Sequence, residues 1–243
     1  MAEMTAAAII TAGGRGVRFG SGAPKQFAAL GGKPLLAHSV ETFSSLDIIS
    51  EIVLVAPDDW VPYVEKEIAG IPGSRVSRVV PGGAERQHSV ENGFNALSGE
   101  PDVVVIHDGV RPFASASLIE EVIREAYNHG AALAALPVGD TVKKAGENGL
   151  VEYTVPRDTL WLAQTPQAFK YELLKEAFDR ARADGFVATD EALLVERIGG
   201  SVKLVMGSPY NIKITTREDL VLGELILSWR RAGAKAPANE RGE

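Results

Sequence analysis

The chain of 243 residues contains no cysteine. This absence excludes a disulfide framework, a thiolate nucleophile and a cysteine-based metal site. Long apolar runs are also missing, and residues 1–5 lack the basic and apolar sections of a signal peptide, so we expect no membrane span and a cytoplasmic location. The net charge of −7 and the pI of about 5.3 argue against nucleic-acid binding.

Acidic residues are absent from residues 5–40, although they outnumber basic residues in the whole chain. Within this window a glycine-rich segment, residues 11–19, directly follows an apolar strand at 6–10. Glycines let backbone N–H groups approach a phosphate closely, and Arg18 and Lys25 add positive charge beside them. The window therefore indicates a site for a small polyanion.

Two common phosphate loops do not fit this segment. Walker A requires Lys and then Ser or Thr after its last glycine, and no glycine here is followed in that way. In the run 14–19, Phe19 stands where the dinucleotide-binding motif has its last small residue. On these residues alone, a phosphate site and an ordinary strand-to-helix turn with solvated cations both remain open.

Strand-like apolar runs alternate with helix-like segments along the chain. This alternation, with strands that are apolar throughout, predicts an α/β, Rossmann-like fold with a mostly parallel sheet and helices on both faces. We expect strands at 6–11, 52–56, 76–80, 103–107, 131–138 and 202–206, and helices at 35–45, 60–69, 86–97, 118–128, 170–183, 190–198 and 216–230. Ser117 is predicted to cap the helix at 118–128, with Glu120 completing a capping box.

A hairpin arm is predicted at about 139–160, where two alternating strands flank a turn at 147–149. A lone two-stranded hairpin is marginally stable in water, so we expect it to pack on something else, and a partner subunit is one candidate. Residues 1–231 are interpreted as a single domain that carries this arm, and residues 232–243 as a disordered tail.

Asp108 stands where the predicted strand at 103–107 opens into the loop His107-Asp-Gly-Val-Arg-Pro112. Ligand-binding groups of α/β enzymes lie at such strand ends, and a carboxylate beside a triphosphate can hold Mg²⁺ or a ribose hydroxyl. A turn pair between Asp108 and Arg111 is the structural alternative.

Further segments complete a set of ordered motifs: 82–89 (GGAERQHS), 161–167 (WLAQTPQ), 189–191 (TDE) and 211–215 (NIKIT). Together with the two loops above, they make the chain resemble the 2-C-methyl-D-erythritol 4-phosphate cytidylyltransferases of isoprenoid precursor synthesis, and more broadly the nucleotidyltransferases of that fold. The resemblance runs from about Ala6 to Trp229.

The resemblance implies roles for individual residues. It assigns catalysis to Arg18, Lys25 and Lys213, and CTP binding to Ala12, Gly14, Gly16, Gly83, Ser89 and Asp108. It places Arg111, Thr141, Arg157, Thr165, Thr189 and Lys213 around a polyol phosphate. It also implies Mg²⁺, held mainly by the CTP phosphates and beside Asp108, and a homodimer in which the arm brings Thr141 and Arg157 to the neighbouring site.

The implied reaction is in-line attack of the acceptor phosphate on the α-phosphorus of CTP, with pyrophosphate leaving. The nucleophile is already ionised, so neither a strong general base nor a covalent intermediate is required. Two alternatives stay open: a ribitol 5-phosphate cytidylyltransferase with the same nucleotide loop, and a catalytically inactive nucleotide sensor on the same fold. The presence of both Arg18 and Lys25 argues against the sensor.

Overall fold

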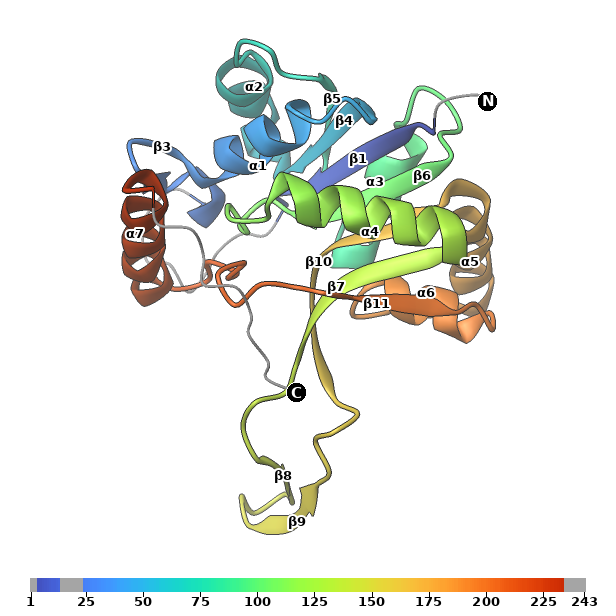
Figure 1. The fold of residues 1–243 in the computed structure, drawn as a ribbon. Helices are drawn as coiled ribbons and strands as arrows, with labels where there is room; N and C mark the ends of the chain where they lie inside the picture. Colours follow the sequence, from blue (N-terminus) through green and yellow to red (C-terminus); the bar gives the residue numbers. More distant parts are fainter. Residues whose placement is uncertain (1–3, 14–23, 234–243) are drawn as a thin grey trace.

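A seven-stranded sheet forms the centre of the molecule (Figure 1). The computed structural model describes residues 4–13 and 24–233. The strand order is β11-β7-β10-β6-β1-β4-β5. These strands are β1 (Ala6–Thr11), β4 (Ile49–Ala56), β5 (Val76–Pro81), β6 (Val103–Asp108), β7 (Ala131–Pro137), β10 (Trp161–Lys170) and β11 (Val202–Met206), and a separate two-stranded sheet pairs β2 (Ala29–Leu30) with β3 (Lys33–Pro34).

The sheet is parallel except at β10. Strand β1 pairs in parallel with β4 and β6, and β5 with β4, whereas β10 runs antiparallel to both β6 and β7. The predicted α/β fold with a mostly parallel sheet is therefore confirmed. The sequence pattern predicted no strand at β10, because the polar run Gln164–Gln167, with Pro166 inside it, interrupts the apolar pattern although all four residues are buried.

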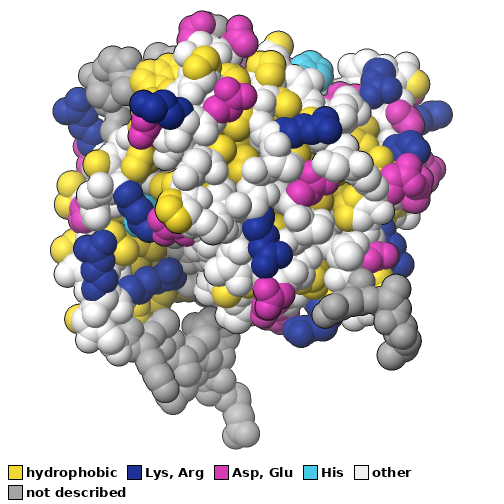
Figure 2. Space-filling model, turned by 90° about the horizontal axis from the view of Figure 1, so that it is seen from above, with side chains coloured by type: hydrophobic (Ala, Val, Ile, Leu, Met, Phe, Trp, Pro, Cys, Tyr) yellow, Lys and Arg dark blue, Asp and Glu magenta, His cyan; other side chains and the backbone are white. Residues whose placement is uncertain are grey.

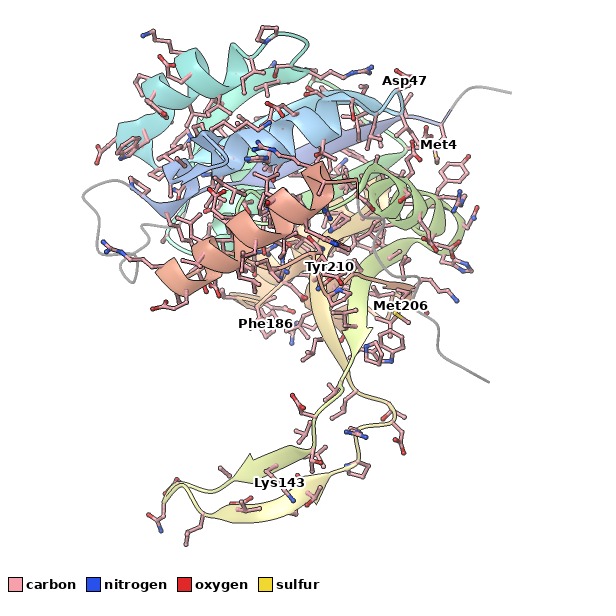
Figure 3. The ribbon with its side chains drawn as sticks, turned by 60° about the vertical axis from the view of Figure 1, so that its left-hand side comes forward. Met4, Asp47, Lys143, Phe186, Met206 and Tyr210 are labelled. Atoms are coloured by element: carbon pink, nitrogen blue, oxygen red, sulfur yellow. The ribbon has the colours of Figure 1, made fainter. Side chains whose placement is uncertain are left out.

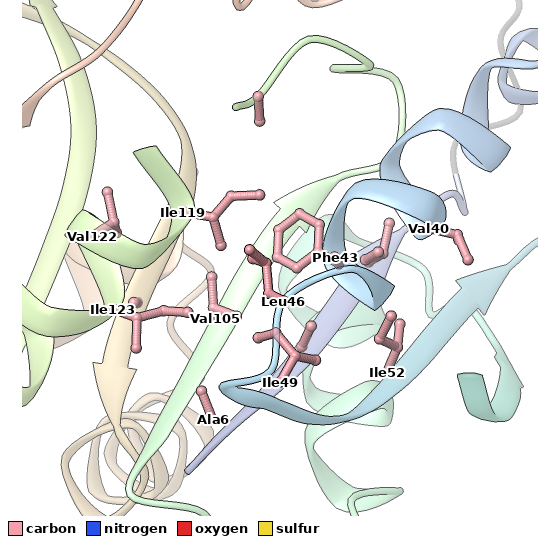
Figure 4. Close-up of a cluster of buried hydrophobic side chains, with 14 of the residues drawn as sticks. Ala6, Val40, Phe43, Leu46, Ile49, Ile52, Val105, Ile119, Val122 and Ile123 are labelled. Atoms are coloured by element: carbon pink, nitrogen blue, oxygen red, sulfur yellow. The ribbon is translucent and has the colours of Figure 1, made fainter. Parts of the chain in front are cut away.

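Helices cover both faces of the sheet, because successive side chains of a strand point to opposite sides. Ile10 of β1 packs with α1 and α4, and its neighbour Ile9 packs on the other face with α3, α5 and α6. Figure 4 shows the first of these clusters, in which Phe43 of α1 and Ile119 of α4 lie over the strands. The helices are α1 (Leu35–Ser44), α2 (Val61–Val64), α3 (Arg86–Asn95), α4 (Ala116–His129), α5 (Tyr171–Asp184), α6 (Glu191–Arg197) and α7 (Arg217–Arg231).

Two local predictions were wrong. Helix α4 is capped by Ser115, whose extended backbone lets its Oγ accept a hydrogen bond from Leu118 N at 3.2 Å, so Ser117 already lies inside the helix. The segment predicted as one helix at 60–69 divides into a 3-10 turn at Asp58–Trp60, the short α2 and a π-helical turn at Glu65–Ala69.

The hairpin arm projects away from the body (Figures 1 and 3). Strands β8 (Val142–Ala145) and β9 (Val151–Val155) pair in antiparallel fashion. Lys143, labelled in Figure 3, lies on this pair, away from the central sheet. Gly149 of the turn adopts φ +72°, a conformation that glycine takes without strain. The arm exposes the apolar side chains of Leu150, Val151 and Tyr153. We therefore still predict that the arm packs against another surface.

The face seen from above in Figure 2 mixes charges of both signs. Figure 2 shows Lys and Arg side chains interspersed with Asp and Glu, and with smaller apolar areas, on the face seen from above. Across residues 4–13 and 24–233, no helix has the length and apolar character that crossing a membrane requires. Of the predicted tail, only Ala232 and Gly233 belong to the described residues.

Candidate functional site

A cavity of about 570 Å³ opens at the edge of the sheet where β1, β5 and β6 end. The carboxyl ends of parallel strands share this edge, which is where ligands bind in open α/β sheets. The lining residues come from five parts of the chain: Thr11, Ala12 and Gly13 at the end of β1, Lys25 and Gln26 next along the chain, Gly83, Ala84, Glu85, Arg86 and Ser89 around the start of α3, Asp108 and Val110 at the end of β6, and Lys213 before α7.

The structure brings six of the predicted site residues together in this lining. They are Ala12, Lys25, Gly83, Ser89, Asp108 and Lys213. The predicted Gly14, Gly16 and Arg18 lie outside the described residues.

The turn between β5 and α3 forms one wall of the cavity. Ser89 Oγ accepts a hydrogen bond from Gly83 N at 3.0 Å and donates to Glu85 O at 3.1 Å. A Cβ atom on Gly83 would lie 2.4 Å from His88 Cβ, so only glycine fits this close approach. These hydrogen bonds fix the Gly83 peptide and the Ser89 hydroxyl group in the cavity lining.

Asp108 is the centre of a cluster of cations. Its Oδ2 lies 2.9 Å from Lys213 Nζ and 3.3 Å from Arg111 Nε, and its Oδ1 lies 3.6 Å from Arg86 Nε. Burial by itself raises the pKa of the Asp108 carboxyl, but Lys213, Arg86 and Arg111 outweigh burial and hold this pKa well below its usual range. Asp108 is therefore ionised at neutral pH and orders the cations around it. Asp108 therefore forms the turn pair with Arg111 that the sequence offered as an alternative, and it also lines the cavity.

Lys213 reaches Asp108 because its loop is fastened to the strands below. Asn211 is fully buried, and its Nδ2 donates to Thr165 O at 2.9 Å and to Gln164 Oε1 at 3.2 Å. Ile214 N donates to Val110 O at 2.9 Å on the other side of the lysine. These hydrogen bonds fix the backbone on both sides of Lys213, so the ammonium group occupies a defined place in the cavity.

A buried layer lies directly beneath Asp108. Burial lowers the pKa of His107 to about 4, so its ring is neutral at neutral pH. Its Nε2 lies 3.1 Å from Arg111 O and must donate to that carbonyl, which leaves Nδ1 to accept from Thr165 Oγ1 at 3.1 Å. Thr165 Oγ1 in turn accepts from Asp108 N at 3.0 Å. The layer holds the Asp108 backbone in place, and His107 belongs to this structural layer.

Arg86 is a cavity residue to which sequence reasoning gave no role. Its Nη1 donates to both carboxylate oxygens of Glu191, at 2.8 and 2.7 Å, and Glu191 is completely buried. Burial raises the pKa of Glu191, and the charge of Arg86 opposes that rise. The motifs that contain the two residues were recognised, but a pairing across so long a stretch of chain leaves no periodic signal in the sequence.

Five predicted acceptor-site residues do not line the cavity. Arg111 and Thr165 lie in the mostly buried layer around Asp108, and Thr189 is exposed on the loop before α6. Thr141 and Arg157 are exposed at the base of the arm, where Arg157 Nη1 donates to Gly139 O. Their proposed contacts with a substrate stay predictions.

The cavity residues fit a magnesium ion only in company with a polyphosphate. Within the described residues, no group of three or more His, Asp or Glu side chains is placed to hold a metal ion. Asp108 supplies one carboxylate. The three cationic side chains beside it would repel a metal ion unless a bound polyanion neutralised their charge. Mg²⁺ commonly takes one or two protein carboxylates and completes its shell with water and substrate phosphates, so Asp108 and a bound triphosphate together would hold it.

Comparisons with known proteins point to one family. The family model for 2-C-methyl-D-erythritol 4-phosphate cytidylyltransferase matches residues 6–229. Proteins of that name are similar to this chain: one from Geobacillus kaustophilus is 46% identical over 93% of this chain and 98% of its own length. Another, from Alkaliphilus oremlandii, is 44% identical over 93% of this chain and 96% of its own length.

Solved structures agree with this match. The crystal structure of 4-diphosphocytidyl-2C-methyl-D-erythritol synthase from Anaerococcus prevotii superposes with a TM-score of 0.82 at 34% identity, covering 93% of this chain and 96% of that one. The crystal structure of 2-C-methyl-D-erythritol 4-phosphate cytidylyltransferase from Thermus thermophilus gives a TM-score of 0.76 at 34% identity, covering 93% of this chain and all of the other.

Proposed function

The chain belongs to the 2-C-methyl-D-erythritol 4-phosphate cytidylyltransferase family, and we propose on that premise that it transfers CMP from CTP to 2-C-methyl-D-erythritol 4-phosphate. The products are pyrophosphate and 4-diphosphocytidyl-2-C-methyl-D-erythritol. The observation that carries the proposal is the cavity itself, where Lys25, Arg86 and Lys213 gather with Asp108 at the carboxyl edge of the parallel strands.

The nucleotide occupies the part of this cavity between β1 and α3. Gly83 and Ser89 face the cytosine, since peptide groups and a hydroxyl there can pair with the amino-bearing edge of the base. Ala12 follows β1 and contacts the nucleotide, together with Gly14 and Gly16 of the sequence motif. Asp108 lies beside the ribose and, together with the phosphates, would hold Mg²⁺.

The reaction is a direct displacement that needs charge stabilisation more than proton transfer. An oxygen of the acceptor phosphate attacks the α-phosphorus of CTP in line with the departing pyrophosphate. Lys25, Lys213 and Arg18 stabilise the negative charge that develops on the transferred phosphoryl group. Mg²⁺ bound to the phosphates would neutralise part of the same charge.

The acceptor is held by a second group of residues that reaches beyond the cavity. Arg111, Thr165 and Thr189 belong to the same subunit, whereas Thr141 and Arg157 come from the arm of a partner. The exposed apolar side chains of the arm support a homodimer, because a protruding two-stranded hairpin gains stability when such side chains are buried against a second copy.

A pyrophosphate-release assay tests the function. Purified protein with CTP and Mg²⁺ should release pyrophosphate when 2-C-methyl-D-erythritol 4-phosphate is added, and far less with ribitol 5-phosphate in a parallel reaction. UTP and ATP in place of CTP should be poorer substrates. Preference for ribitol 5-phosphate, which the names of the relatives do not favour, would contradict the proposal, and CTP binding without any turnover would support the sensor instead.

A further inference from the structure

Glu191 is a buried charge that the proposed reaction does not use. It is the first residue of α6, its side chain is completely buried, and both of its carboxylate oxygens lie within 2.8 Å of Arg86 Nη1. Withdrawing a carboxylate from water is expensive, and replacing a buried ion pair by apolar residues is often neutral or even stabilising. Stability alone is therefore a weak reason for this pair.

The pair determines where Arg86 lies. The guanidinium is held between two carboxylates, because Nη1 contacts Glu191 while Nε lies 3.6 Å from Asp108 Oδ1. Asp108 already has Lys213 and Arg111 as close neighbours. Without Glu191, Arg86 would be drawn towards Asp108 alone and away from its present place in the cavity lining.

The backbone at Glu191 is fixed from two sides, so its carboxylate has a defined position. Asp190 caps α6 by accepting from Leu193 N at 3.1 Å, and its other oxygen accepts from Gln167 Nε2 at 3.0 Å. From α3, Gln87 Oε1 accepts from Ala188 N at 2.7 Å. The start of α3 and the loop before α6 are thereby held together next to the cavity.

Arg86 has donors left for a ligand. Its side chain is 28% exposed and lines the cavity on the side of Gly83 and Ser89. Among the described residues, its Nη2 makes no hydrogen bond, although a guanidinium offers five N–H donors in a fixed planar arrangement that suits phosphate oxygens. An anion in this part of the cavity would meet a cation whose orientation is already set.

We propose that Glu191 is a positioning residue, which holds the Arg86 guanidinium at the cavity wall to bind a phosphate of the nucleotide. The inference rests on the proposed function, because that function supplies the triphosphate. A carboxylate that acts through Arg86 improves binding by fixing the geometry of the cation before the nucleotide arrives.

Calorimetric titration of CTP with Mg²⁺ into Glu191→Gln tests this role. The amide keeps the shape of Glu191 but removes the charge that holds Arg86, so the Kd for CTP should rise at least about tenfold, the loss of roughly one charge-assisted hydrogen bond. Gln87→Met is the matched control, since it disturbs the same loop contact without touching a cavity cation, and it should shift the melting temperature while leaving the Kd near that of the wild type.

A second variant separates positioning from stability and covers the case in which Glu191→Gln does not fold. The double variant R86M/E191L replaces the pair by apolar side chains and should fold with a melting temperature close to that of the wild type, yet bind CTP at least about tenfold more weakly. A wild-type Kd in folded Glu191→Gln or in the folded double variant overturns the proposal. The wild-type protein tests the proposed function separately. If it binds CTP but does not transfer CMP, the proposed function fails, while the comparison of CTP Kd values between variants still tests the role of Glu191.

Discussion

Lys213 Nζ lies 2.9 Å from Asp108 Oδ2, so a lysine from the loop before α7 meets the carboxylate that ends β6. The contact fixes the ammonium group in the cavity at the carboxyl ends of the strands, where the phosphoryl group would be transferred. Asp108 orders Lys213 without neutralising the cavity, because two arginines also lie close to it.

Replacing Lys213 by Met should lower kcat/KM by about 10²-fold or more, since it removes a charge that stabilises the transition state. The melting temperature should change little, because Asp108 keeps Arg86 and Arg111 as partners. Steady-state pyrophosphate release measures the effect. Lys33→Met is a matched control, since its partner Glu41 is on the partly exposed surface of α1 and such pairs contribute little. Wild-type turnover in Lys213→Met would remove the lysine from the catalytic set.

Lys25→Ala and Arg18→Ala should each reduce kcat about 10²-fold or more, with a smaller effect on CTP affinity, because these cations act where transition-state charge develops. Arg18→Lys should also be impaired, since an ammonium group cannot replace the planar arginine fork. Single-turnover rates and CTP titrations separate the two effects. If CTP affinity falls and the chemical rate is unchanged, both residues serve ground-state binding only.

The free energy of unfolding should fall as the pH is lowered from about 6.5 to about 4. The pKa of His107 is lowered to about 4 by burial, so over this range the unfolded chain binds a proton that the folded protein excludes. The difference corresponds to a loss of about 3 kcal/mol by pH 4, relative to pH 7. Asp108 draws the His107 pKa upward, whereas Arg111 and Lys213 oppose it, and His38, whose pKa is also lowered by burial, adds a slope of the same sign.

Urea unfolding of the protein without nucleotide, at several pH values, measures this slope. His107→Gln removes the titrating ring, so the variant should be less stable at pH 7 and should lose less stability on acidification. Equal slopes for wild type and variant would show that His107 is accessible to protons in the folded protein.

The arm should complete the site of a partner subunit. Arg157→Ala should raise KM for the acceptor phosphate and barely affect CTP binding, because the base of the arm lies outside the nucleotide cavity. When inactive Arg157→Ala and Lys25→Ala homodimers exchange subunits, one site of each heterodimer carries both intact residues and activity should return. Confirmed exchange without activity, or an active monomer, would contradict a shared site.

The strand pattern predicted most of the sheet because the central parallel strands, such as β1 and β6, are buried on both faces and are therefore apolar almost throughout. Strand β10 was not predicted, since it contains the buried polar residues Gln164, Thr165 and Gln167. Their side chains form hydrogen bonds with Ser208, with β6 and with the capping residue Asp190 of α6. The predicted cap of α4 lay two residues too far along the chain, because serine is an equally good cap at 115 and 117 and only the backbone conformation distinguishes the two positions.

The cavity could be predicted where a motif carries a glycine turn or a strand-end carboxylate, as at Gly83 and Asp108. The link between Arg86 and Glu191 could not be predicted, because it depends on the tertiary fold that places α3 and α6 on the same face of the sheet. The role of Thr165 beneath Asp108 depends likewise on the pairing of β10 with β6.

The most direct measurement of the central claim follows one oxygen atom through the reaction. 2-C-methyl-D-erythritol 4-phosphate with a heavy-oxygen-labelled phosphate is incubated with CTP, Mg²⁺ and the protein, and the products are analysed by mass spectrometry. Direct attack of the acceptor phosphate on the α-phosphorus predicts that all of the label stays in 4-diphosphocytidyl-2-C-methyl-D-erythritol and that the pyrophosphate is unlabelled. Labelled pyrophosphate, labelled inorganic phosphate, or no nucleotide-linked product would contradict the account.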